Sequence, residues 1–135
     1  MIVADTNLIA YFFIKGDFTD QASAVFHKDP EWAAPLLWRS EFRNVLALYI
    51  RKGFLNLFEA VDLIQEAELL MNGMEFLVPS LNILKLTEES KCSAYDCEFV
   101  ALAKQLELEL VTSDTLILNK FPGTAVHMSE FIKKG

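Results

Sequence analysis

The sequence IVADTN at residues 2–7 carries most of the information about the fold of this chain. Ile2–Ala4 is a short apolar run, and Asp5–Asn7 ends it with residue types that cap helices. A helix is expected to follow from about Leu8 to Ile14. A short apolar strand that passes directly into a helix is the repeating unit of parallel α/β sheets.

The same alternation of strand and helix continues to the end of the chain. Further strands are expected at Trp32–Ala34, Glu75–Val78, Leu108–Thr112 and Ala125–His127. Helices are expected between them: one capped by Thr19, one from about Leu36 to Lys52 with Pro35 in its first turn, and others from Asn56, Ser80, Ser93, Ser113 and Ser129.

These elements predict an α/β protein with a doubly wound, mainly parallel sheet of four to five strands flanked by helices. The strands are short and almost entirely apolar, as expected when helices cover both faces of a sheet. The chain has 135 residues and contains no linker-like stretch and no internal repeat. A single domain over residues 1–135 is therefore expected.

The amino-acid composition and the net charge exclude some classes of protein. The chain is 53% hydrophobic and carries a net charge of −7, which argues against disorder and against coating of nucleic acid by electrostatics alone. Nucleic acid stays open as a substrate, because a metal ion in an acidic pocket presents positive charge locally. The longest apolar run, Leu8–Ile14, is far shorter than the about 20 residues that span a bilayer. The N-terminus does not resemble a signal peptide, so a cytoplasmic protein without membrane association is expected.

Cysteine and histidine usage disfavours a zinc site. Cys92 and Cys97 are the only cysteines, and His27 and His127 have no ligand spacing with them. A single disulfide is one alternative, but without a secretory signal the two cysteines are expected to be buried, reduced thiols.

Four carboxylates follow or face the carboxyl ends of expected strands. Asp5 and Asp114 come directly after strands, Glu41 lies in the early turns of one helix, and Asp96 lies at the start of another. Crossover helices run antiparallel to the strands they connect, so all four positions belong to one edge of a parallel sheet. Ligands of open α/β sheets bind at this edge.

Each acid also has a purely structural interpretation. Asp5 and Asp114 can cap the helices that follow them, and Asp96 can form a capping box with Ser93. Glu41 can be a solvated charge on a helix surface. Each interpretation suffices for one residue, but four acids at one edge point to a shared pocket.

A pocket of crowded carboxylates needs protons or cations to relieve repulsion. Without paired histidine or cysteine ligands, Mg²⁺ or Mn²⁺ is expected. Asp5, Asp96 and Asp114 are the expected ligands, and Glu41 is either a ligand or the group that orients an attacking water. Asn7 and Asn44 are weaker candidates for holding water or phosphate, since both also suit ordinary polar positions at a helix start and on a helix surface.

Four short stretches resemble the motifs of PIN-domain nucleases in their order and spacing. They are residues 5–7 (DTN), 40–46 (SEFRNVL), 95–103 (YDCEFVALA) and 112–114 (TSD). The resemblance runs essentially from end to end, and the length is similar to that of the VapC-type toxin of a VapBC toxin–antitoxin pair. It gives Ser113 of the last motif a supporting place in the site.

The resemblance implies a nuclease that uses one or two Mg²⁺ or Mn²⁺ ions to cleave RNA, leaving 5′-phosphate and 3′-hydroxyl ends. It also implies a homodimer and a small antitoxin whose tail enters the pocket. Arg39 and Arg43 share one helix face, about 200° around from Glu41. They are either contacts for RNA or antitoxin, or solvated charges.

One position departs from the family pattern. Many members have a second acidic or polar residue two positions after the last aspartate, where this chain has Leu116. Asn119 is the available substitute, and the number of bound ions stays open.

Three other classes of protein fit part of the pattern. A haloacid dehalogenase-type phosphatase needs a second acid where this chain has Asn7, and a receiver-type signalling domain needs a lysine after its last strand, where Met128 and Ser129 stand. The third is a non-catalytic RNA- or protein-binding module with an incomplete pocket, which Leu116 mildly favours.

Overall fold

The computed structural model describes residues 1–134 and contains a five-stranded parallel sheet with the strand order β3-β2-β1-β4-β5. This architecture confirms the predicted doubly wound α/β fold. The strands are β1 (Ile2–Ala4), β2 (Trp32–Pro35), β3 (Glu75–Phe76), β4 (Leu110–Thr112) and β5 (Ala125–His127).

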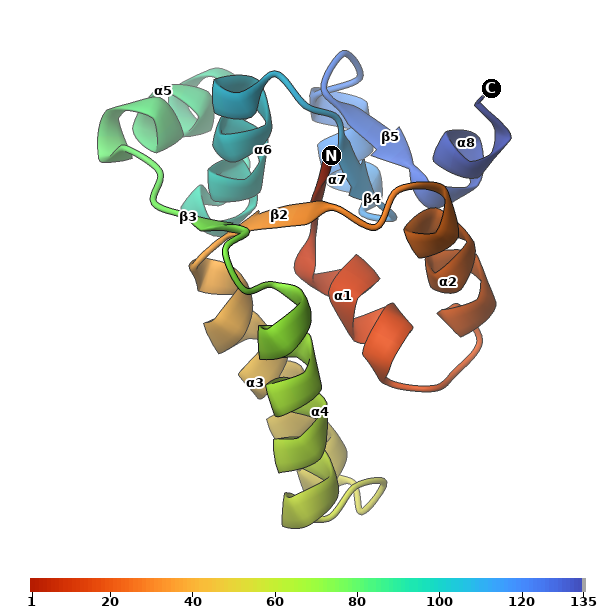
Figure 1. Cartoon of the computed structure of the whole chain (residues 1–135). Coiled ribbons are helices and arrows are strands. Elements are labelled where there is room, and N and C mark those ends of the chain that lie inside the picture. Colours follow the sequence, from red (N-terminus) through yellow and green to blue (C-terminus); the bar gives the residue numbers. More distant parts are fainter. Residues whose placement is uncertain (135) are drawn as a thin grey trace.

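Eight helices connect or flank these strands within the described residues (Figure 1). They are α1 (Thr6–Phe13), α2 (Thr19–Lys28), α3 (Leu37–Arg51), α4 (Leu57–Leu70), α5 (Ser80–Ser90), α6 (Ala94–Leu106), α7 (Thr115–Lys120) and α8 (Met128–Lys133). No helix within residues 1–134 is long and apolar enough to span a membrane.

The strand order reverses at β1. The chain proceeds outward from β1 to β2 and β3, and then returns to place β4 on the other side of β1. Val3 is in register with Ala33 on one side and with Leu110 on the other. The carboxyl ends of β1 and β4 are therefore adjacent, and the crevice between them is where open α/β sheets bind ligands.

Helices cover both sides of the sheet. Helix α6 packs on β1, β2 and β4, with α5 against its outer side, whereas α1 packs against α2 and α3. In Figure 1, α5 and α6 lie above the sheet and α1 and α2 below it. The strands are buried between these layers, which explains why β1, β2 and β4 contain almost only apolar residues.

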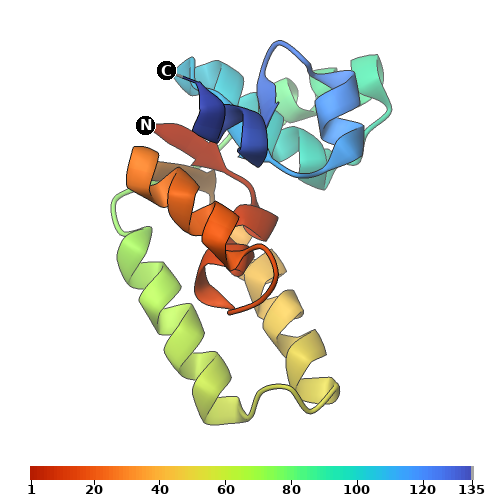
Figure 2. The ribbon, with the colours of Figure 1, turned by 90° about the vertical axis from the view of Figure 1, so that its right-hand side faces the viewer.

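Helices α3 and α4 form a hairpin that extends away from the sheet (Figures 1 and 2). Gly53 ends the first helix with a φ of +79°, which a glycine adopts without steric cost. Asn56 then starts α4 through a complete capping box, in which Asn56 and Glu59 each bond to the other's backbone N–H.

Aromatic side chains from β2, α1, α2 and α3 contribute to the core. Trp32, Trp38 and Phe42 are fully buried, and Phe12 stacks on Phe26 at a centroid distance of 4.7 Å. Cys92 and Cys97 are both buried and free, as predicted.

Several local predictions were wrong. Phe18, not Thr19, holds the cap position of α2, because the Thr19 hydroxyl donates to the carbonyl of Tyr11 and accepts from the N–H of Gly16. Pro35 is the last residue of β2 rather than part of the next helix. Two strands are also shorter than predicted: β3 ends at Phe76, and β4 begins only at Leu110.

Candidate active site

A pocket of about 520 Å³ opens at the carboxyl edge of the sheet, beside the point where strand order reverses. All four sequence-predicted acids line it, although they come from four separate parts of the chain. These are Asp5 after β1, Glu41 on α3, Asp96 in the first turn of α6, and Asp114 after β4.

Asp5 is the most buried of the four acids. It is only 6% exposed, and one carboxylate oxygen accepts a hydrogen bond from the N–H of Leu8 at 2.8 Å. The other accepts from the hydroxyl of Thr112. Burial raises the pKa of Asp5 to about 6, and the negative charges of Asp114 and Glu41 add to this rise, although both hydrogen bonds oppose it. Asp5 therefore caps α1 and also lies in a pocket where neighbouring carboxylates repel one another.

Asp114 occupies the equivalent place after β4. Its Oδ1 accepts from the N–H of Ile117 at 3.0 Å and caps α7. Its own N–H donates to the Thr112 hydroxyl at 3.0 Å. Because the same hydroxyl donates to Asp5, Thr112 links the acids of two neighbouring strands.

Glu41 is held by the residue that follows Asp5. The hydroxyl of Thr6 donates to Oε1 of Glu41 at 2.6 Å, and Thr6 itself is buried. Partial burial raises the pKa of Glu41, and the charges of Asp96 and Glu98 raise it further. The hydrogen bond fixes one oxygen of Glu41 and leaves the other for a ligand.

Asp96 completes the set from α6. Its N–H donates to the hydroxyl of Ser93 at 3.1 Å, which is half of the predicted capping box. Burial, followed by the charge of Asp114, raises the pKa of the Asp96 carboxyl. Another acid of the pocket therefore contributes to the raised pKa of Asp5, Glu41 and Asp96.

Sequence reasoning missed three residues that act on these acids: Thr6, Thr112 and Glu98. Thr112 did leave a signal in the sequence, since it is the polar residue that ends an otherwise apolar strand, and the structure shows that it is fully buried. Glu98 left none, because a glutamate on a helix is most often a surface charge.

The residues predicted from the sequence to support the four acids, or to contact RNA or an antitoxin, divide into two groups. Asn7 and Asn44 line the pocket, whereas Ser113, Arg39 and Arg43 do not. Arg39 instead forms ion pairs with Glu75 at 2.6 Å and with Glu68 at 3.0 Å. Its guanidinium ties α3 to β3 and α4.

Leu116, where the sequence departs from the family pattern, also lies outside the pocket. Neither Leu116 nor Asn119 is among the residues that line it. The side chain of Leu116 is 46% exposed on α7. In this structure Leu116 therefore contributes no side chain to the lining of the acidic pocket.

The donor chemistry of the pocket fits a hard divalent cation. The four acidic residues that line it supply carboxylate oxygens, which Mg²⁺ and Mn²⁺ prefer, and no histidine or cysteine is among its lining residues. Within residues 1–134, no three acidic, histidine or cysteine side chains stand close enough together to form a ready-made metal site. Burial is the main cause of the raised pKa of Asp5, and a bound cation would offset both the cost of burying its charge and the smaller repulsion from Asp114 and Glu41.

Comparison with solved structures shows the same fold in several proteins. PAE2754 from Pyrobaculum aerophilum is 20% identical, with a TM-score of 0.76 over 97% of this chain and 92% of that one. FitAcB from Neisseria gonorrhoeae is 20% identical, with a TM-score of 0.76 over 96% and 99%. A toxin–antitoxin complex from Klebsiella pneumoniae is 18% identical, with a TM-score of 0.65 over 95% and 98%. No curated protein sequence matches the chain significantly.

The fold and the pocket together define an α/β protein with an acidic site at the switch point of its sheet. The sequence model of the PIN domain matches residues 2–121, and the chain belongs to the PIN-domain family. PIN domains are nucleases. The matched range includes all four acids of the pocket.

Proposed function

We propose that this protein is a metal-dependent endoribonuclease that acts as the toxin of a type II toxin–antitoxin pair. The observation that carries the proposal is the convergence of Asp5, Glu41, Asp96 and Asp114 in one pocket. These residues span more than a hundred positions of sequence, and the parallel topology brings them to one edge.

Asp5, Asp96 and Asp114 would hold Mg²⁺ or Mn²⁺, as one or two ions. Such a cation, when bound, supplies Lewis acidity and neutralises charge on the phosphate of the substrate. The hydrogen bonds from Leu8 and Thr112 fix the orientation of Asp5 before any ligand arrives. The fold thus sets the position of the most buried ligand in advance.

Glu41 is suited to orient the attacking water and to accept its proton. Thr6 holds Oε1, so Oε2 is the atom that would take the proton. The raised pKa of Glu41 makes its carboxylate a stronger base than an exposed glutamate. Asn7 and Asn44 can donate their amide N–H groups to phosphate oxygens at the rim of the pocket.

RNA, an antitoxin partner and a homodimer belong to the same proposal. Two of the similar structures are described as FitAcB and as a toxin–antitoxin complex, which supports an antitoxin for this chain. With a net charge of −7, the protein as a whole repels nucleic acid, so binding must depend on local charge. A cytoplasmic location follows from the same role.

The test is an RNA cleavage assay with Mg²⁺ or Mn²⁺, with and without a chelator. Wild-type protein is expected to produce fragments with 5′-phosphate and 3′-hydroxyl ends, and Asp5→Asn is expected to produce none. Asp20→Asn is the matched control, because Asp20 is an exposed acid of α2 outside the pocket. Equal cleavage by wild type and Asp5→Asn would identify a contaminating nuclease and refute the proposal.

A second candidate is a non-catalytic module that binds RNA or protein. Leu116 favours it, because an apolar side chain stands at the position where many family members have a second acidic or polar residue. Metal-dependent RNA binding without cleavage, measured on the same preparations, would select this candidate.

A further inference from the structure

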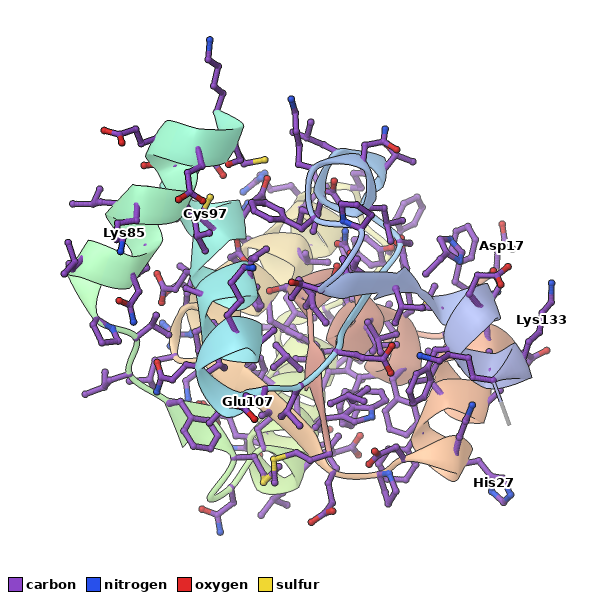
Figure 3. The ribbon with its side chains drawn as sticks, turned by 90° about the horizontal axis from the view of Figure 1, so that it is seen from above. Asp17, His27, Lys85, Cys97, Glu107 and Lys133 are labelled. Carbon is purple, nitrogen blue, oxygen red and sulfur yellow. The ribbon has the colours of Figure 1, made fainter. Side chains whose placement is uncertain are left out.

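The acidic pocket has an exposed aromatic residue at its rim, Tyr95. Tyr95 is the second residue of α6 and directly precedes Asp96, and both residues line the pocket. It is 63% exposed, whereas Phe99, the other aromatic residue of the lining, is buried. In Figure 3 the label of Cys97 marks the first turns of α6, on the side of the molecule opposite to Lys133. The side chain of Tyr95 is therefore open to solvent beside an acid of the pocket.

Tyr95 differs from the other two tyrosines in how its ring is packed. Tyr11 lies 4.9 Å from Phe18, and Tyr49 lies 6.0 Å from Phe54, measured between ring centroids. Tyr95 forms no such ring pair with any of residues 1–134, and its hydroxyl makes no hydrogen bond to any of them. Its ring and its hydroxyl are therefore available to a ligand of the pocket.

The pocket itself offers no positive side chain to a polyanion. Its lining residues, all of which lie within residues 1–134, include no lysine and no arginine, and the whole chain carries a net charge of −7. Lysine and arginine contacts to phosphates supply most of the affinity when a protein binds nucleic acid without sequence preference. Stacking of a base on an aromatic ring does not depend on net charge. At this site, stacking is therefore the available source of affinity beyond a bound cation.

The two helices at the rim differ in chemistry. On α3, Ser40 and Asn44 are exposed, line the pocket and lie four residues apart, so they share one helix face. Their hydroxyl and amide groups suit the sugar and phosphate groups of a nucleotide. On α6, the ring of Tyr95 suits a base.

We propose that Tyr95 stacks on the nucleobase next to the scissile phosphate. This inference rests on the proposed ribonuclease activity. A base must be free of pairing and stacking in a duplex before it can meet the ring, so Tyr95 selects RNA that is unpaired at the cleaved step. The alternative use of this side chain is a hydrogen bond from its hydroxyl to a phosphate oxygen, and replacement by phenylalanine distinguishes the two.

Steady-state cleavage of a short, labelled, mixed-sequence RNA in Mn²⁺ compares three variants with wild-type protein. Tyr95→Leu keeps an apolar side chain but removes the ring, and it is expected to raise KM roughly five- to hundred-fold with little change in kcat. Tyr95→Phe and Tyr95→Trp keep a ring and are expected to remain close to wild type. Phe58→Leu is the matched control, because Phe58 is 79% exposed and lies on α4 outside the pocket.

Abasic nucleotides in the RNA locate the contact. Removal of the base on one side of the scissile phosphate is expected to weaken cleavage by wild-type protein and to leave Tyr95→Leu unaffected, because the ring that this base contacts is already missing. An abasic nucleotide farther along the RNA should affect both proteins equally. If neither neighbouring base shows this coupling to Tyr95, the inference is overturned.

Two further measurements do not depend on cleavage. On the Asp5→Asn background, fluorescence anisotropy of the same RNA should show that Tyr95→Leu weakens binding by a factor similar to the change in KM. The rise in melting temperature caused by Mn²⁺ should be equal in wild type and Tyr95→Leu. A smaller rise in Tyr95→Leu would show that the substitution displaces Asp96, and it would overturn the inference.

The outcomes separate the role of Tyr95 from the nuclease activity. If wild-type protein cleaves RNA and Tyr95→Leu keeps the wild-type KM, the inference is overturned. It is also overturned if Tyr95→Phe loses as much as Tyr95→Leu, which would assign the contact to the hydroxyl, or if Phe58→Leu loses as much. If wild-type protein never cleaves RNA but Tyr95→Leu selectively weakens binding, the proposed activity fails and the stacking contact stands.

Discussion

Asp5 is the residue whose chemistry the fold alters most. The folded protein holds the proton of this carboxyl up to a pH of about 6, whereas an aspartate ordinarily releases it near 3.8. Between these values the native state binds more protons than the unfolded state. The free energy of unfolding therefore falls as the pH rises through this window, by up to about 3 kcal/mol.

Asp5→Asn should accordingly stabilise the metal-free protein at pH 7.5, by about 1–3 kcal/mol. Asparagine keeps the oxygen that caps α1 and carries no charge. At pH 4 the wild-type carboxyl is itself mostly protonated, so the advantage should nearly disappear. Urea denaturation in a chelating buffer at both pH values measures this, with Asp20→Asn as the control. Equal stability of Asp5→Asn and wild type at pH 7.5 would contradict the assignment of a raised pKa.

A second prediction at the scale of single residues concerns Thr112. Thr112→Val removes the hydroxyl that donates to Asp5 and accepts from the N–H of Asp114, at constant side-chain volume. We expect a loss of about 1–3 kcal/mol in unfolding free energy and a further rise in the pKa of Asp5. Thr112→Ser should recover most of both.

Stability comes from urea denaturation, and the pKa comes from titration of the Asp5 carboxyl by NMR. An unchanged Asp5 pKa in Thr112→Val would show that the hydroxyl does not hold this acid.

At the scale of secondary-structure elements, Arg39 connects α3, β3 and α4. It lies on α3, bonds to Glu75 of β3 through two nitrogens at 2.6 and 2.7 Å, and pairs with Glu68 of α4. The partial burial of Glu75 and the additional hydrogen bond from Trp38 at 2.8 Å make this network more than a surface ion pair.

We therefore predict that Arg39→Met destabilises the protein by about 1–3 kcal/mol, because it leaves the Glu75 carboxylate without its main partner. Arg43→Met on the same helix should change stability by less than about 0.5 kcal/mol, since Arg43 is exposed. Urea denaturation of the two variants gives the comparison. A similar small effect for both would show that the network is as weak as an isolated surface pair.

Most helices and strands could be predicted from the sequence, because each combines a periodic pattern of apolar residues with a residue type that is typical of its first position. Asn56 and Glu59 are an example, since the capping box that they form needs only residues three apart. Thr19 shows the limit of this reasoning. Its hydroxyl bonds to Tyr11, eight positions earlier, and a loop geometry of this kind overrides the usual preference for threonine at a cap.

The candidate site was predictable to a similar degree. The four acids followed from topology, because the ends of parallel strands must share an edge. Thr112 and Asp5 are separated by 107 positions, so their hydrogen bond depends on the register of β1 against β4. Thr6 and Glu41 meet across 35 positions for a similar reason. Register of this kind is not visible in local patterns of sequence.

For the whole molecule, stability should depend on divalent cations. A cation that binds only the native state raises the melting temperature, and Mg²⁺ or Mn²⁺ in the millimolar range should raise it by several degrees. The shift should be larger at pH 7.5 than at pH 5, because the raised pKa of Asp5 leaves that acid largely protonated at the lower value.

Thermal denaturation with added metal and then with chelator measures this dependence. Asp114→Asn should reduce the shift, whereas Asp62→Asn, at an exposed position of α4, should not. Shifts of the same size in both variants would show that the cations act on the general acidity of the chain and not on the pocket.

The interleaved order of the sheet has a consequence for biosynthesis. Strand β4 pairs with β1 on the side opposite to β2, and Asp114, which follows β4, is the last of the four acids in the sequence. While the ribosome is still extending the polypeptide, Asp5, Glu41 and Asp96 lack their fourth companion and the strand that positions it. A nascent chain that has not yet been extended past β4 and Asp114 therefore cannot assemble the acidic pocket.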